Sequence, residues 1–402
     1  MKKGKVNILH LFALFCVFAI SATYSSGATL VKIGRLLLTI IFIICNFNSL
    51  NMKSFLKKYS VICILFYLYS ALTIFWAIST ENVIIALSTQ LYILIVDLIL
   101  YNIMDNNPSF IYKIIDALII GSIALGIYIY SRFGITVFMN ARTVEGAGNA
   151  NTIAFISSFA IMFAFAMTKM RNLPKKKNNL YFLSMIINAM FALLSASKKI
   201  FIFLGVFFAV YLLFTNNPLK LFRNIIIIIV ALAIVRYLIM NNEFLYNLIG
   251  HRITIMFSTL NGAKADGSTG FRISLLNWGL EWFKQRPLFG YGLDCFKYKL
   301  GSTYQTWAGY NAYAHNNYIE LLVDFGLVGT LIYYSLYIDI LKKSFSKIRE
   351  SKKNVVILAL ILSLMVGEFA QVSYSKAFLQ IVLLLIWVLS HNKLEDKKAT
   401  DN

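Results

Sequence analysis

The sequence predicts an all-α polytopic membrane protein, and three observations support this fold class. Of its 402 residues, 59% are hydrophobic and 14% are charged, whereas soluble domains are about 45–50% apolar and about 25% charged. Uncharged stretches of about 17–22 residues recur along the chain, and a helix of that length crosses a hydrocarbon core of about 30 Å. The basic residues also alternate between successive connections, as they do in chains that cross the membrane repeatedly.

Twelve apolar segments are expected to cross the membrane. Each is predicted to be a helix, because backbone groups in lipid must be hydrogen-bonded within their own segment. The first segment is similar in length to a signal peptide, but no convincing cleavage site follows it and many further spans do, so we expect a retained helix. The predicted spans are 8–23, 34–47, 60–78, 83–104, 111–131, 150–168, 180–195, 200–215, 224–240, 318–341, 354–372 and 376–391.

The distribution of basic residues predicts the orientation. With the N-terminus placed in the cytoplasm, the segments on that side hold 23 of the 38 lysines and arginines, with dense clusters at 169–177 and 342–353. Cytoplasmic loops carry this excess in membrane proteins. We therefore expect a multi-pass protein of the bacterial inner membrane with both termini cytoplasmic. The net charge of +21 then reflects topology, which argues against a nucleic-acid partner.

One connection, residues 241–317, differs from all the others. It divides the chain into nine spans in residues 1–240 and three spans with a cytoplasmic tail in residues 318–402. The charge alternation puts it on the outer side of the membrane. It is about 77 residues long and rich in aromatic residues and glycine, and loops beyond about 12–15 residues are usually functional or disordered. Its composition favours a folded, functional loop.

A surface helix is predicted inside this loop, over residues 271–285. Phe271, Leu275, Trp278 and Trp282 recur at i, i+4, i+7 and i+11, which places them on one face of a helix. Tryptophan is enriched at membrane–water interfaces. We expect the helix to lie on the membrane surface with this face buried.

Charged or titratable side chains gather at four outer positions. Arginines bind phosphate groups bidentately and stabilise developing negative charge, and a histidine can act as a base near neutral pH. Each of these residues is also compatible with a structural or flanking role at the membrane surface. The candidates are Arg142 in ARTVEGAGNANTIA, Lys198 and Lys199 in SASKK, Arg272 and Arg286 in TGFRISLLNWGLEWFKQRPLFGYGLDCF, and His315 in AHNNYIELLVDFGLVG.

Acidic residues inside predicted spans are costly to bury and tend to be functional. Glu320 and Asp324 are four residues apart, on one helical face below His315. They are expected to orient the histidine or an arginine, to bind acceptor hydroxyls, or to form a buried polar pair, and Asn316 is a further candidate for substrate binding. No metal-binding or cysteine motif is visible, so no cofactor is expected. The five acidic residues within spans are Asp97, Asp116, Glu320, Asp324 and Glu368.

These motifs resemble the O-antigen polymerase/ligase superfamily, which includes Wzy-type polymerases and lipopolysaccharide core ligases. The resemblance covers residues 140–335 well. It runs through an arginine–tryptophan helix at Arg272 to Trp278, P-L-F-G-Y-G-L-x-x-F at Pro287 to Phe296, and H-N-x-Y-x-x-L-L-x-x-x-G-L-x-G at His315 to Gly329. The family often shows Ser-Arg at the turn that here reads Ser197-Lys198-Lys199, and lysine binds phosphate as a point charge rather than by a fork.

The resemblance implies a GT-C-like membrane glycosyltransferase. It would take a glycan from undecaprenyl pyrophosphate and transfer it to an acceptor glycan without a metal. Arg142 and Arg272 would then hold the donor pyrophosphate, and His315 would be catalytic or would orient the acceptor. Lys198 and Lys199 would be further substrate contacts.

Several functions remain open within and outside this family. Polymerisation of repeat units into O-antigen or capsular polysaccharide is favoured, because such polymerases are numerous, and a chain-length regulator is an expected partner. A ligase that transfers glycan to lipid A core shares the motifs. A glycolipid flippase would suit twelve spans, but transporters commonly show two related halves and no internal repeat is visible here. A non-enzymatic scaffold would not need three polar candidates on one side.

Overall fold

The structure is a computed structural model that describes residues 8–23, 40, 44, 50–140, 143–145, 147–214, 217–251, 253–255, 267–304, 312–346, 348 and 351–391. Within these ranges the chain is almost entirely helical, with one antiparallel pair of two-residue strands, β1 and β2. The elements are α1 (Ile8–Ala22), η2 (Met52–Leu56), α3 (Lys58–Leu72), η3 (Thr73–Phe75), α4 (Thr80–Asn106), η4 (Pro108–Phe110), α5 (Ile111–Phe133), α6 (Val137–Asn140), β1 (Thr143–Val144), β2 (Gly148–Asn149), α7 (Ala150–Met170), α8 (Lys175–Leu194), α9 (Lys199–Leu213), α10 (Pro218–Asn241), α11 (Glu243–Leu245), η5 (Tyr246–Gly250), α13 (Gly267–Gln285), α14 (Phe296–Tyr304), α15 (Asn317–Ser346), α16 (Lys352–Glu368) and α17 (Ala377–His391).

The chain is an all-α polytopic membrane protein. In the described part, six helices are long and apolar enough to cross a membrane, and α1, α9 and α17 are shorter apolar helices. Every predicted span is found as a helix except 34–47, which lies outside the described residues apart from Ile40 and Ile44. The total of twelve spans therefore stays a prediction. The six long helices are Lys58–Phe75, Thr80–Asn106, Pro108–Phe133, Ala150–Met170, Pro218–Asn241 and Asn317–Ser346.

Three predicted spans, whose edges were expected to within a few residues, differ in detail from the helices of the structure. The span 60–78 ends early, because α3 stops at Leu72 and continues only as the short turn η3. The span 354–372 ends at Glu368, and an irregular segment follows it. The span 318–341 is interrupted at Gly326, where the backbone leaves the helical region with φ 63° and ψ −164°. The last two irregular segments both contribute to the candidate site.

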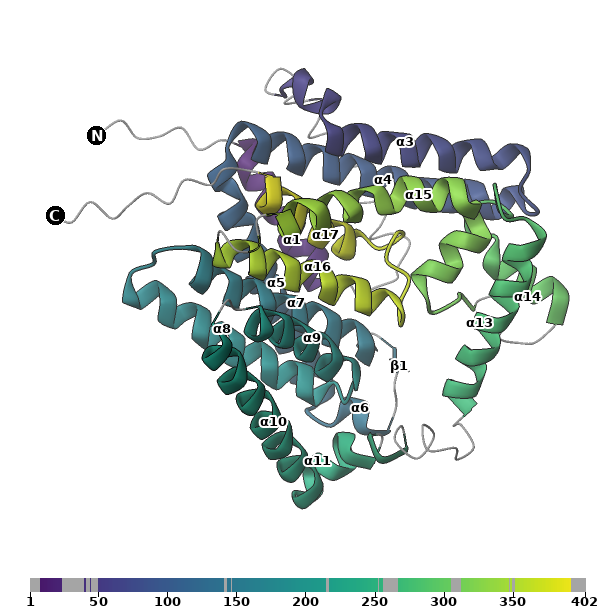
Figure 1. Cartoon of the computed structure of the whole chain (residues 1–402). Coiled ribbons are helices and arrows are strands. Elements are labelled where there is room, and N and C mark those ends of the chain that lie inside the picture. Colours follow the sequence, from purple (N-terminus) through teal and green to yellow (C-terminus); the bar gives the residue numbers. More distant parts are fainter. Residues whose placement is uncertain are drawn as a thin grey trace.

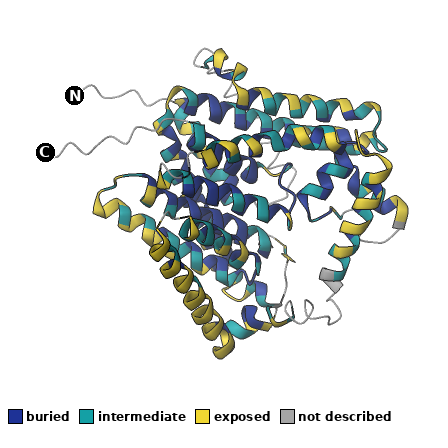
Figure 2. Cartoon of the chain, viewed as in Figure 1, coloured by how far each residue is buried: buried dark blue, intermediate teal, exposed yellow. Residues whose placement is uncertain are grey.

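The centre of the molecule is formed by α7, α16 and α17. Most residues of α16 and α17 are buried, and Figure 2 shows these helices largely in dark blue at the centre of the fold. By contrast, α10 lies along one edge, and only Asn224 and Ile239 are buried in it. Its exposed apolar surface is what a lipid-facing helix presents, because hydrocarbon solvates such side chains.

The helices α3, α4 and α15 run side by side, and α13 crosses their ends (Figure 1). The predicted apolar face of α13 is confirmed, because Leu275 and Trp282 are buried. The Trp282 ring packs edge-on against Phe296, with ring centroids 5.3 Å apart. Its placement on the membrane surface stays a prediction, and the crossing direction agrees with it.

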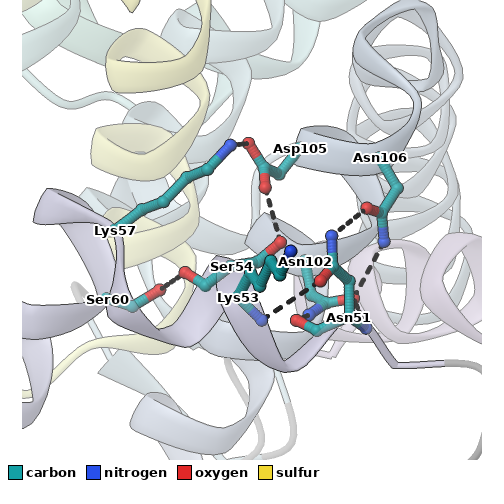
Figure 3. A network of polar contacts seen from close by, with 8 residues as sticks. All are labelled: Asn51, Lys53, Ser54, Lys57, Ser60, Asn102, Asp105 and Asn106. Atoms are coloured by element: carbon teal, nitrogen blue, oxygen red, sulfur yellow. Dashed lines mark hydrogen bonds and ion pairs between the residues drawn. The ribbon is translucent and has the colours of Figure 1, made fainter.

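The opposite end of this bundle is held by a polar network (Figure 3). The Asn51 side-chain amide donates to Asn106 Oδ1 at 2.8 Å, and the Asn102 amide donates to the Asn51 carbonyl at 2.7 Å. Asp105 accepts bonds from Ser54 and Lys57, each at 2.5 Å. The network fixes η2 against the last turn of α4.

Candidate functional site

The P-L-F-G-Y-G-L motif forms a loop that hydrogen-bonds to the backbone of α15 where this helix is interrupted. A helix interrupted at Gly326 leaves carbonyls of its first half and N–H groups of its second half without intrahelical partners, which is costly in lipid. The loop supplies both kinds of partner. Four backbone bonds join them: Leu327 N–H to Pro287 O at 2.8 Å, Val328 N–H to Leu288 O at 3.2 Å, Tyr291 N–H to Val323 O at 2.8 Å and Gly292 N–H to Asp324 O at 2.8 Å.

Glycine is required on both sides of this contact. Gly290 has φ 68°, and a Cβ there would lie 2.5 Å from the Asp324 carbonyl oxygen. A Cβ on Gly326 would collide with the Leu288 carbonyl. Side chains are disfavoured at such φ values in any case. Gly290 and Gly326 therefore allow the close approach of the two backbones.

The Asp324 carboxylate accepts hydrogen bonds that hold this loop and the residues after it against α15. It is fully buried, its Oδ1 accepts the Phe296 N–H at 2.7 Å, and its Oδ2 accepts the Asp294 N–H at 3.1 Å. The Tyr374 hydroxyl donates to Oδ2 at 3.1 Å. Both oxygens are therefore engaged within the chain, which favours a role in holding the site over direct contact with an acceptor.

Glu320 and Asn316 fix the turn that carries His315. Glu320 Oε2 accepts the Ala314 N–H at 2.5 Å, and Asn316 Oδ1 accepts the Ile319 N–H at 3.1 Å, as an N-cap of α15. Both side chains are buried. His315 is held between them at φ 53°, a conformation that costs non-glycine residues of order 1–3 kcal/mol and tends to occur at functional sites.

Arg272 and Lys199 come from two other segments distant in the sequence and lie near enough to His315 for their charges to act on it. Burial, with the nearby Arg272 and Lys199 cations, lowers the pKa of His315 to about 3. The imidazole is therefore neutral at pH 7. The Tyr313 ring packs on it, with ring centroids 4.0 Å apart.

Arg272 forms no ion pair with a carboxylate among the residues that the structure describes. A cation near a buried histidine and without a counter-ion favours an anionic ligand, because such a ligand compensates the charge.

Lys199 begins α9 and is nearly buried. Its Nζ donates to the Ala370 carbonyl at 2.7 Å and lies 5.2 Å from the centroid of the Phe155 ring. The preceding turn is tied to the start of α7, because the Ser197 hydroxyl donates to Asn151 Oδ1 at 2.8 Å. No sequence pattern indicates Phe155 or the Ala370 carbonyl, which belongs to the segment after α16.

The remaining candidates differ in their placement. Arg142 lies outside the described residues. Lys198 occupies the N-cap position of α9, next to Lys199. Arg286 lies past the end of α13, about 20 Å along the helix from Arg272 at a rise of about 1.5 Å per residue, and its guanidinium lies 4.8 Å from the Tyr291 ring centroid. Arg286 is thus separate from the cluster of Arg272, Lys199 and His315.

Fold and site together define a polytopic membrane protein with a cationic cluster where α9 and α15 begin. Residues 183–334 match the sequence model of a family described as O-antigen ligase. The matched segment contains the Ser197 turn, the P-L-F-G-Y-G-L loop and His315. This match supports the resemblance to the O-antigen polymerase/ligase superfamily, and members of the matched family transfer glycosyl groups in O-antigen assembly. A search of curated proteins found no match.

Proposed function

We propose that this protein polymerises oligosaccharide repeat units carried on undecaprenyl pyrophosphate into O-antigen or capsular polysaccharide. The observation that carries the proposal is the convergence of Arg272, Lys199 and His315, without a carboxylate on Arg272 among the described residues. Such a cluster suits a pyrophosphate, which bears several negative charges and needs several cations in a water-poor site.

The proposed reaction is a displacement at the first sugar of the donor chain. A hydroxyl of the acceptor glycan forms a new bond to the anomeric carbon, and the bond from that carbon to the pyrophosphate oxygen breaks. Arg272 and Lys199 stabilise the negative charge that develops on the leaving pyrophosphate, and preorganised groups of this kind contribute about 10²–10³-fold each. The chemistry requires no metal ion.

His315 is the proposed proton acceptor or acceptor-orienting group. Its low pKa makes it a weak base in the unliganded protein, because two cations and burial oppose its protonation. A bound pyrophosphate reverses this electrostatic effect by neutralising the cations. The imidazole then becomes basic enough to accept the hydroxyl proton only when the donor is in place.

Arg142 and Lys198 are proposed as further pyrophosphate contacts. Arg142 directly precedes the β1–β2 hairpin, and this hairpin leads into Asn151, which bonds the Ser197 turn. Asn316, Glu320 and Asp324 are proposed to hold His315 and the adjoining loop in position.

The basic clusters support an inner-membrane location with both termini in the cytoplasm. Lys57 and Lys58 form ion pairs with Asp105 and Asp339 at one end of the bundle, and Arg272 and His315 lie at the other. The site is therefore proposed to face outward, where lipid-linked repeat units would reach it. A chain-length regulator is a proposed partner on that side.

Ligation of glycan to lipid A core is the second candidate, and the description of the matched family favours it. Donor chemistry is the same in both reactions, and only the acceptor differs. A polymerase yields a ladder of lipid-linked chains, whereas a ligase yields glycan attached to lipid A core.

The test replaces the chromosomal gene with variants and compares the envelope glycan by gel electrophoresis. We expect Arg272→Ala and His315→Ala to reach the membrane in normal amounts and to yield only single-repeat glycan. Arg286→Ala is the matched control and should give the normal ladder. Long chains of normal abundance from either site variant would refute the assignment.

A further inference from the structure

A second polar site lies within the membrane-spanning bundle, and its lining shares no residue with the cluster of Arg272, Lys199 and His315. Gln90 and Asp97 are seven residues apart on α4 and so occupy one helical face. Their exposed fractions are 6% and 3%. Three of their buried atoms form no hydrogen bond with any described group of the protein: Gln90 Nε2, Gln90 Oε1 and Asp97 Oδ1.

These unpaired groups carry an energetic penalty. A buried donor or acceptor without a partner costs about 1–3 kcal/mol, and no bulk water is present at this depth in the membrane to satisfy it. Three such atoms on one face therefore call for a polar occupant.

Both side chains line a cavity of about 40 Å³ between α3, α4, α15 and α17. A water molecule needs roughly 10–15 Å³ measured in this way, so the cavity has room for about three. Other polar side chains in its wall are Tyr333, Tyr374 and Gln380. The space and its lining suit water, which can donate to Asp97 and Gln90 and accept from the amide.

The surroundings of Asp97 favour its neutral acid. Its Oδ2 has one long contact, 3.4 Å from the Tyr59 hydroxyl, and no cation pairs with Asp97 among the described residues. The nearby Lys58 is engaged with Asp339. An unpaired carboxylate is far more costly to bury than a carboxylic acid. The titratable or polar groups that face it are Tyr59 and Cys63 on α3, Tyr333 on α15, Gln380 on α17 and Tyr374 on the segment before α17.

We propose that Gln90 and Asp97 form an intramembrane site for water and one exchangeable proton, held on the Asp97 carboxyl. Ionisable residues inside a membrane span commonly mark proton sites. Tyr374 lines this cavity and also donates its hydroxyl to Asp324. The proton site therefore shares a wall with the side chain that holds the outer loop. The proposal does not depend on the glycan chemistry.

Infrared difference spectroscopy of the full-length protein in nanodiscs tests the site directly. Subtracting the spectrum of Asp97→Asn from that of the wild type at pH 7 should leave a carbonyl band of a protonated carboxylic acid. The band should shift after transfer to D₂O, because water reaches the proton. Asp105→Asn is the control, because its carboxylate is paired with Lys57 and should give no such band.

The proposal would be overturned by the lack of a protonated-acid band assignable to Asp97, or by a band that D₂O leaves unchanged over hours. A band that appears only in sodium-free buffer would also overturn it, because the site would then bind a cation. Should Asp97→Asn not fold, Gln90→Leu replaces it. That variant should move the Asp97 band to higher frequency by removing hydrogen-bonded water, and an unmoved band would contradict the proposal.

Discussion

The two ends of the bundle formed by α3, α4 and α15 treat charge in opposite ways. At one end, Lys57 pairs with Asp105, and Asp339 accepts both Lys58 at 2.5 Å and His391 at 2.9 Å. Figure 3 shows how the first of these pairs continues into a network of asparagines and serines. Every charge named here has a protein partner, so this end needs no ligand.

At the other end, cations gather around a neutral histidine. Arg272 and Lys199 both approach His315, and the buried carboxylates nearby bond to backbone N–H groups instead of to these cations. Paired charges fasten the helices, whereas Arg272, which has no carboxylate partner among the described residues, contributes a positive potential that an anionic ligand would neutralise. Whether a charged side chain has a carboxylate or cation partner in the protein therefore distinguishes structural from functional polar residues better than residue type does.

The largest effect is expected where the loop meets the broken helix. Gly326→Ala would put a methyl group against the Leu288 carbonyl at a left-handed φ, so we expect a loss of several kcal/mol in stability and loss of glycan transfer. Gly205→Ala is the control, because a Cβ there meets nothing within 4 Å, and it should be neutral or stabilising by up to about 1 kcal/mol. Thermal unfolding in detergent measures both. Equal behaviour of the two variants would mean that the break in α15 does not exist.

An intermediate effect is expected from acidification. His315 has a folded-state pKa of about 3 and an unfolded value of about 6.5, so below pH 6.5 the unfolded chain binds a proton that the folded protein does not. Stability should fall between pH 6.5 and 3, by roughly 1–2 kcal/mol at pH 5. His315→Gln should remove this part of the acid sensitivity. Identical changes in melting temperature between pH 7.5 and 5 in both proteins would show that His315 is not buried among cations.

The smallest effect is expected at the paired end. The Lys57–Asp105 contact is half exposed on the lysine side, and such pairs contribute about 0.2–1 kcal/mol. A double-mutant cycle with Lys57→Ala and Asp105→Ala should give a coupling in that range, which high salt weakens. Glycan transfer should be unchanged in Lys57→Ala. A defect in glycan transfer in Lys57→Ala would contradict a purely structural role for this end of the bundle.

Much of the fold follows from the sequence, because apolar length and basic flanks report directly on helices in a membrane. The break at Gly326 does not follow from them. The residues around it are apolar or glycine apart from Asp324 and Thr330, and the bonds that stabilise the break come from Pro287 to Gly292, which lie far away in the sequence. The irregular backbone is stable at that position because these distant residues supply its hydrogen bonds.

The sequence predicts His315, Arg272 and Lys199 as site residues, and their roles in binding a donor stay a prediction. The spacing of Glu320 and Asp324 indicates a shared helical face. It does not indicate the backbone N–H groups that they bind, because helical periodicity contains no information about hydrogen-bond partners in other segments. Gln90 gave no signal, because one amide within an apolar span looks unremarkable until its lack of partners is seen.

Binding of undecaprenyl pyrophosphate to the full-length protein in nanodiscs tests the central claim most directly, because it needs neither the acceptor nor the sugar. Arg272→Gln and Lys199→Gln should each weaken binding by at least about tenfold, as loss of a charge-assisted contact of about 1.4 kcal/mol or more requires. Arg286→Gln, about 20 Å along the helix, should bind within about twofold of the wild type. Unchanged affinity in both site variants, or an equal loss in Arg286→Gln, would contradict a pyrophosphate site at Arg272, Lys199 and His315.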